Sequence, residues 1–205
     1  MHVRPYYILF SGVNGAGKST LFHTRMWLGA HSSETMGRVN PDEILREHGW
    51  DWHDRRAQIR AGKEAVRLIR GYFDARDSFN QETTLTGKSA LRNVSAAHEL
   101  GYRVIVYYVG VADPRIANDR IAHRVSIGGH FIDPETVQRR FRASLDNLTQ
   151  AVGIADEAYL YDNTRQLELE ARFVQGKLAY VNPVKPELTW IDELLAALGY
   201  EQFSL

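Results

Sequence analysis

The sequence of 205 residues contains no cysteine, so it forms neither a disulfide framework nor a thiolate metal site. It also carries no net charge, because 25 basic residues balance 25 acidic ones, and this disfavours general binding to nucleic acid. No apolar run reaches the roughly 18 residues of a membrane span, and the apolar N-terminal run is too short for a signal peptide. These absences fit a cytoplasmic protein with no membrane or nucleic-acid partner.

Patterns of buried strands alternate with patterns of helices along the chain. We expect strands over residues 6–11, 36–40, 78–83, 102–111 and 157–163, and helices over 18–27, 42–48, 52–76, 87–100, 113–127 and 133–150. This alternation predicts an α/β fold in three α/β/α layers, with a mainly parallel sheet and one domain over residues 1–205. A hairpin that turns at Gln175-Gly176 and a helix over 187–198 form a C-terminal addition, about 166–200, at the edge of the sheet.

A phosphate-binding loop follows the first expected strand. Its sequence, GVNGAGKS, matches G-x-x-x-x-G-K-[ST] at each fixed position and opens a helix. The glycines let backbone N–H groups point at phosphate oxygens, the lysine reaches the β- and γ-phosphates, and the serine hydroxyl binds Mg²⁺. The sequence therefore predicts a site for ATP and Mg²⁺. Its residues are Gly12, Asn14, Gly15, Ala16, Gly17, Lys18, Ser19 and Thr20.

Motifs that are missing narrow the class of phosphate-loop protein. Neither D-x-x-G nor N-K-x-D occurs, which argues against a GTPase and leaves a kinase or an ATPase. The apolar strand ending in Asp that is typical of motor ATPases is also missing, since Asp113 is better placed as a helix cap before Pro114. A compact phosphotransferase is therefore favoured.

Two acidic residues are candidates for the acceptor side of such a kinase. Asp42 and Glu82 follow expected strands, so both should lie at the sheet edge that carries Lys18. Asp42 could orient or deprotonate the acceptor hydroxyl, or it could simply cap a helix. Glu82 could supply a metal carboxylate, or it could be a solvated loop acid. Hydroxyl side chains follow it, at Thr83, Thr84 and Thr86.

Two expected helices joined by glycines carry basic residues. Arg120 and Arg124 are four residues apart and share one helical face, Gly128-Gly129 ends that helix, and Arg140 lies in the next one. This pattern predicts a mobile lid over about residues 113–150 that brings arginine to the γ-phosphate. The alternative is a solvated helical hairpin with ordinary surface arginines.

The histidines do not form a metal-binding pattern. Neither H-x-x-x-H nor H-x-H occurs, so we expect no histidine metal site. His130, which follows the two glycines, is the one histidine that we single out, either to stabilise the turn of the lid or to contact a ligand.

The motifs together resemble those of the zeta-toxin family, and especially its short, stand-alone bacterial branch. The stretches GVNGAGKST, NPDEI, QETTLTG and DRIAHRVSIGGHFIDPETVQRRF carry the resemblance, which runs from Gly12 to Thr164. It implies a P-loop kinase-like fold that uses ATP and Mg²⁺, an acceptor such as UDP-N-acetylglucosamine, and a protein antitoxin as partner.

The resemblance also implies roles for single residues. Lys18 and Ser19 would bind the nucleotide phosphates and the metal ion, Asp42 would be the catalytic base, and Glu82 would lie near the acceptor and the metal.

The arginine roles and the acceptor stay open at this stage. Arg120 or Arg124 would be one phosphate-binding arginine, and Arg140 is the candidate for a second. The acceptor is the hydroxyl of a small molecule. Alternatives to a UDP-amino sugar are another metabolite or an antibiotic on the same scaffold, and an ATP-binding regulatory module without transfer.

Overall fold

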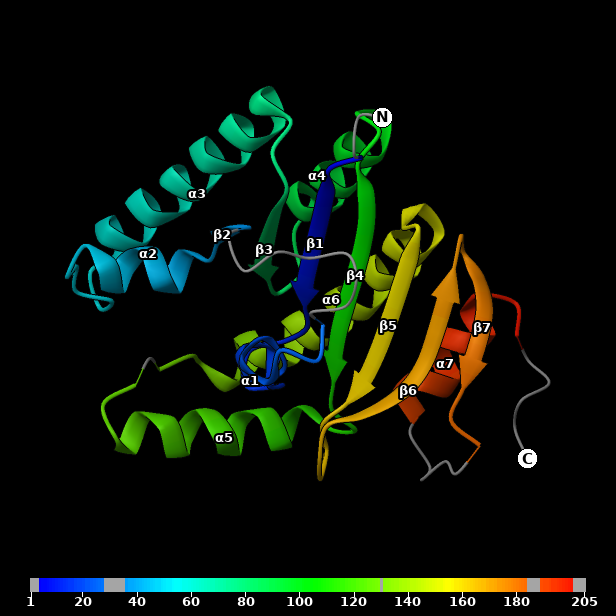
Figure 1. Ribbon diagram of the computed structural model, residues 1–205. Coiled ribbons are helices and arrows are strands. Elements are labelled where there is room, and N and C mark those ends of the chain that lie inside the picture. Colours follow the sequence, from blue (N-terminus) through cyan, green and yellow to red (C-terminus); the bar gives the residue numbers. More distant parts are fainter. Residues whose placement is uncertain (1–3, 28–35, 130, 184–188, 201–205) are drawn as a thin grey trace.

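The computed structural model describes residues 4–27, 36–129, 131–183 and 189–200 (Figure 1). The strands are β1 (Tyr6–Ser11), β2 (Gly37–Val39), β3 (Phe79–Thr83), β4 (Arg103–Gly110), β5 (Glu157–Asp162), β6 (Glu168–Val174) and β7 (Lys177–Val181). The helices are α1 (Lys18–Thr24), α2 (Pro41–Glu47), α3 (Arg55–Ala75), α4 (Lys88–Glu99), α5 (Pro114–Ser126), α6 (Pro134–Ile154) and α7 (Thr189–Ala197). Each of these elements overlaps one expected from the sequence.

All the strands form one sheet, in the order β2-β3-β1-β4-β5-β6-β7. The first five in this order are parallel, and β6 and β7 continue the sheet as an antiparallel hairpin. The carboxyl ends of β1, β2, β3 and β5 therefore meet at one edge, where ligands of open α/β sheets bind.

Helices cover both faces of this sheet. Ile8 and Phe10 of β1 pack with α1 and α5, while Tyr7 and Leu9 pack into the larger core under α3, α4, α6 and α7. Figure 1 shows α1 in front of the sheet, α5 below the carboxyl ends of its strands, and α4, α6 and α7 behind it. The three α/β/α layers and the mainly parallel sheet are thus confirmed.

Local backbone chemistry decides where helices begin and end. Asp113 caps α5, since its Oδ1 accepts from the Arg115 amide at 2.7 Å, as the sequence predicts. The helix expected over 18–27 ends at Thr24, because Arg25 adopts a left-handed conformation with φ 56°. Asp54 starts α3 by accepting from the Arg56 amide.

The segment expected to form a lid, residues 113–150, comprises α5 and most of α6. α6 extends to Ile154, and its second half carries Ser144, Leu148 and Ala151, which are fully buried in the structure. α5 and the start of α6 instead contribute Ala117, Ile121 and Val137 to the smaller core on the other face of the sheet.

The C-terminal addition is attached to the end of β5. The hairpin turns at Gln175-Gly176 as expected, with φ angles of 51° and 71°. On α7, the Trp190 indole packs against Tyr108, and its Nε1 donates to Asp162 Oδ2 at 2.9 Å. None of the described helices is long and apolar enough to cross a membrane.

Candidate active site

The phosphate loop joins β1 to α1 in a conformation that only glycine accepts easily. Gly12 has φ 132° and Gly17 has φ 110°, and a side chain at either position would collide, with the Val109 carbonyl and with the Asn163 amide respectively. Asn163, directly after β5, donates its Nδ2 to the Ala16 carbonyl at 2.8 Å. The loop is therefore fixed to two neighbouring strands.

Lys18 is a buried cation at the start of α1. Its side chain is 8% exposed, and its Nζ donates to the Val13 carbonyl at 3.2 Å. Burial lowers the pKa of Lys18, and the Glu82 and Asp42 carboxylates partly offset this effect. An anion bound beside Lys18 would stabilise its charged form, because burial has removed the water that would otherwise do so.

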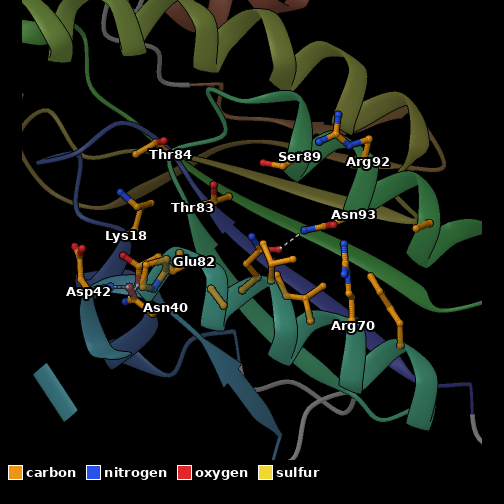
Figure 2. A pocket seen from close by; sticks show the side chains of 18 of the residues that line it. Lys18, Asn40, Asp42, Arg70, Glu82, Thr83, Thr84, Ser89, Arg92 and Asn93 are labelled. Carbon is orange, nitrogen blue, oxygen red and sulfur yellow. Dashed lines mark hydrogen bonds between the residues drawn. The ribbon is translucent and has the colours of Figure 1, made fainter. Parts of the chain in front are cut away.

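Asp42 does not cap α2, because Asn40 does. The Asn40 Oδ1 accepts from the Asp42 amide at 3.0 Å, and Pro41 occupies the first helical turn. The Asp42 carboxylate is exposed and lines the cavity beside Lys18 (Figure 2). The capping alternative for Asp42 is therefore wrong.

Glu82 at the end of β3 is buried and fully engaged. It is 9% exposed, its Oε1 accepts from Ser19 Oγ at 3.0 Å, and its Oε2 accepts from Arg38 at 2.7 Å and from Asn40 at 3.2 Å. Glu82 is not a solvated loop acid. It connects the phosphate loop to β2 and to the start of α2.

Arg38 is a site residue that the sequence reasoning missed. Its guanidinium donates to Glu43, Asn80 and Glu82, and it lies over the Phe22 ring at 3.6 Å from the centroid. Arg38 and Asn80 are register partners on β2 and β3. No motif marks either residue, and only the pairing of these two strands could have indicated them.

The candidate arginines have different surroundings. Arg120 donates to three backbone carbonyls, those of Gly15, Asn163 and Thr164, at 3.5, 2.6 and 3.3 Å. Arg140 donates to Asn14 Oδ1 at 2.7 Å, and burial lowers its pKa. Arg124 is exposed, and its charge acts on Lys18. Arg120 thus holds the loop, whereas Arg124 of α5 lines the loop cavity and Arg140 of α6 contacts Asn14.

Two cavities meet at these residues. The smaller, of about 480 Å³, is lined by Arg120, Arg124 and the loop residues Asn14, Gly15 and Gly17 to Thr20. The larger, of about 610 Å³, runs between α3 and α4 and is also lined by Thr83 and Thr84. The side chains common to both are Asn14, Lys18, Asp42 and Glu82. A donor in one cavity and an acceptor in the other would therefore meet at Lys18 and Asp42.

The side-chain oxygen atoms of Ser19 and Glu82 are suitable ligands for a Mg²⁺ ion that is bound together with a nucleotide. Mg²⁺ prefers oxygen ligands and usually retains several waters beside one or two carboxylates and the substrate phosphates. No group of three or more His, Asp or Glu side chains that could hold a metal ion occurs in the described part of the chain. The residues present thus fit a nucleotide-borne ion rather than an all-protein cage. His130 lies outside the described residues.

Sequence comparisons identify relatives. A family model described as Zeta toxin matches residues 2–169. An uncharacterised protein of Haemophilus influenzae is 31% identical over 137 residues, which are 65% of this chain and 91% of that protein.

Solved structures show similar folds. A crystal structure of AvrRxo1-ORF1:-ORF2 with ATP has a TM-score of 0.66 at 16% identity, and the match covers 100% of this chain and 66% of that one. A structure from the PezAT chromosomal toxin–antitoxin system of Streptococcus pneumoniae has a TM-score of 0.58 at 16% identity, with 95% and 78% covered. At these identities the likeness shows the fold alone.

Proposed function

The chain belongs to the zeta-toxin family, and on that premise we propose that it is an ATP-dependent kinase that phosphorylates a hydroxyl group of a small molecule. The observation that carries the proposal is that Lys18, Asp42 and Glu82 line both the cavity of the phosphate loop and the larger cleft beside it. A kinase needs such a junction, because its donor and its acceptor must meet in line.

Asp42 is the proposed base. It accepts the proton of the acceptor hydroxyl while that oxygen bonds to the γ-phosphorus and the bond from phosphorus to the oxygen of the departing ADP breaks. Lys18, with its buried ammonium group, counters the charge on the phosphate oxygens. Arg124 and Arg140 add positive charge from the lid helices, and Arg120 keeps the loop in place.

Ser19 and Glu82 are the proposed ligands of Mg²⁺. When bound, this ion neutralises charge on the nucleotide phosphates. Arg38 and Asn40 hold Glu82 Oε2, so that Oε1 stays directed at Ser19.

We propose a UDP-amino sugar such as UDP-N-acetylglucosamine as the acceptor. Family membership supports this choice, and the cleft volume of about 610 Å³ lies within the range of small-molecule sites. A cytoplasmic location, where ATP is available, and a protein antitoxin as partner belong to the same proposal.

A transfer assay with γ-labelled ATP and Mg²⁺ tests this function, with UDP-sugars, nucleosides and simple sugars as acceptors. Asp42→Asn should bind ATP as the parent does and should transfer label at least about 100-fold more slowly, since a positioned base contributes that much. Glu47→Gln, at the other end of α2, is the matched control and should be fully active.

The outcomes separate the alternatives. Label on another acceptor would keep the mechanism and change the substrate. Full transfer by Asp42→Asn would remove the proposed base, and ATP binding without transfer to any acceptor would indicate a regulatory module.

A further inference from the structure

The cleft that we propose for the acceptor is longer than the reaction itself requires. It extends from Lys18 and Asp42 along β3, between the facing sides of α3 and α4. Figure 2 shows Lys18, Asn40, Asp42 and Glu82 at one end and Arg70, Arg92 and Asn93 at the other. The far end takes no part in the chemistry described above, so it is available to recognise the rest of the acceptor.

Helical spacing brings these far residues to the cleft. Ser89, Arg92, Asn93 and Ala96 of α4 recur at intervals of three and four residues, which places them on one face. Ile69, Arg70 and Phe73 of α3 line the opposite wall in the same way.

Charges are segregated along the cleft. The acidic residues among those that line it are Asp42 and Glu82, and both lie at the phosphate-loop end. Arg70 and Arg92, at the other end, form no ion pair with any carboxylate of the described residues, whereas Arg67 on the same helix pairs with Glu64 at 3.6 Å. The far end therefore holds two cations without an anion of their own.

Other polar groups of the cleft also favour the binding of an anion there. The Gln81 Oε1 accepts from the Tyr7 hydroxyl at 2.7 Å and from Asn93 Nδ2 at 3.2 Å, so the group that Gln81 has left to offer is its N–H₂ donor. Ser89 adds a hydroxyl to the same cleft. Ala65, Ile69 and Phe73 of α3 give the cleft an apolar wall.

We propose that Arg70 and Arg92 bind an anionic group of the acceptor, a phosphate or a carboxylate, and so restrict the substrates to anionic hydroxyl compounds. The hydroxyl lies at Asp42, the body of the molecule lies against the apolar wall, and the anion lies between α3 and α4. This inference rests on the proposed kinase function. It assigns specificity to two residues that touch the substrate away from the transferred phosphoryl group.

Transfer kinetics give the first test. The acceptors are N-acetylglucosamine, its 1-phosphate and its UDP derivative, and the variants are Arg70→Gln, Arg92→Gln and the double variant. Each single substitution should raise KM for the anionic acceptors about tenfold, the typical loss of one charge-assisted hydrogen bond, with kcat little changed. Arg67→Gln removes the same charge from α3 outside the cleft and should leave KM unchanged. Equal KM values in parent and double variant would overturn the proposal.

A binding experiment separates this proposal from the kinase function. The side-chain Nε–H signals of Arg70 and Arg92 are assigned by their loss in the single variants and followed by NMR in protein saturated with Mg²⁺ and a non-hydrolysable ATP analogue. N-acetylglucosamine 1-phosphate or glucuronic acid should shift both signals, and neutral N-acetylglucosamine should not. The two anions distinguish a phosphate from a carboxylate site.

Shifted signals without transfer to any compound would sink the kinase proposal alone. Signals that respond to neither anion at millimolar concentration, or equally to the neutral sugar, would overturn the anion site.

Discussion

Glu157 shows how one buried carboxylate connects three strands. On β5 it accepts from the Tyr159 hydroxyl at 2.6 Å, from Arg103 of β4 at 2.6 Å and from Arg172 of β6 at 2.8 Å. Burial alone would raise the pKa of Glu157, but these hydrogen bonds outweigh it and lower the pKa from 4.5 to about 2. The ionised form is therefore the form that stabilises the fold.

This shift predicts an acid dependence of stability. Because the folded pKa lies below the unfolded value, the contribution is complete above pH 4.5 and is lost as the pH falls toward about 2. Glu157→Gln should lower the free energy of unfolding near neutral pH by up to about 3 kcal/mol and should flatten its decline in acid. Urea unfolding of both proteins at several pH values measures this. Parallel stability curves in acid would contradict it.

At the scale of elements, the start of α2 connects a helix cap with both candidate acidic residues of the site. Asn40 accepts from the Asp42 amide, and its own amide donates to Glu82. One side chain thus contacts the backbone of Asp42 and the carboxylate of Glu82.

Asn40→Ala should therefore affect activity more than stability. Loss of the cap costs about 1 kcal/mol of unfolding free energy. The kcat should fall more than tenfold, because the Asp42 backbone and the Glu82 carboxylate each lose a positioning contact. Asn40→Asp should keep the cap but also lose activity, since it places a second negative charge beside Glu82. Urea unfolding and kcat at saturating ATP measure the two effects. An Asn40→Asp variant with parental kcat would rule out this positioning role.

Most of the helices and strands, and the position of both candidate acidic residues, could be predicted from the sequence. The phosphate-loop motif located Lys18, and the rule that parallel strands share a carboxyl edge brought Asp42 and Glu82 to it. The sequence could not reveal Arg38 and Asn80 as site residues, because their contact depends on the register of two strands that lie far apart in the chain. The end of α1 was missed because Arg25, a residue with a side chain, takes a left-handed conformation that no local signal announces.

At the scale of the whole molecule, the C-terminal addition supports the phosphate loop. Trp190 and Thr164 both donate to Asp162, the Thr164 carbonyl accepts from Arg120, and Arg120 also reaches Gly15. α7 lies beyond residues 2–169, the part that the family model matches. A segment outside the family pattern is thus connected to the site.

Trp190→Phe tests this connection. The substitution leaves a smaller aromatic ring in the core and removes a donor from Asp162, so the free energy of unfolding should fall by at least about 1 kcal/mol. ATP should bind several-fold more weakly. Tyr200→Phe is the control, because it removes a hydrogen bond to the Leu178 amide in the same addition, away from the loop. Calorimetric titration with ATP compares them. Equal ATP affinity in the two variants would remove α7 from the support of the site.

The same connection has a consequence for the order in which the protein is made. Lys18 is synthesised before Asn163 and Trp190, and the hydrogen bond from Asn163 to the Ala16 carbonyl joins residues that are 147 positions apart. Such long-range contacts close late in folding. A chain truncated before Asn163 therefore carries the phosphate-loop motif without the contact that fixes the Ala16 carbonyl.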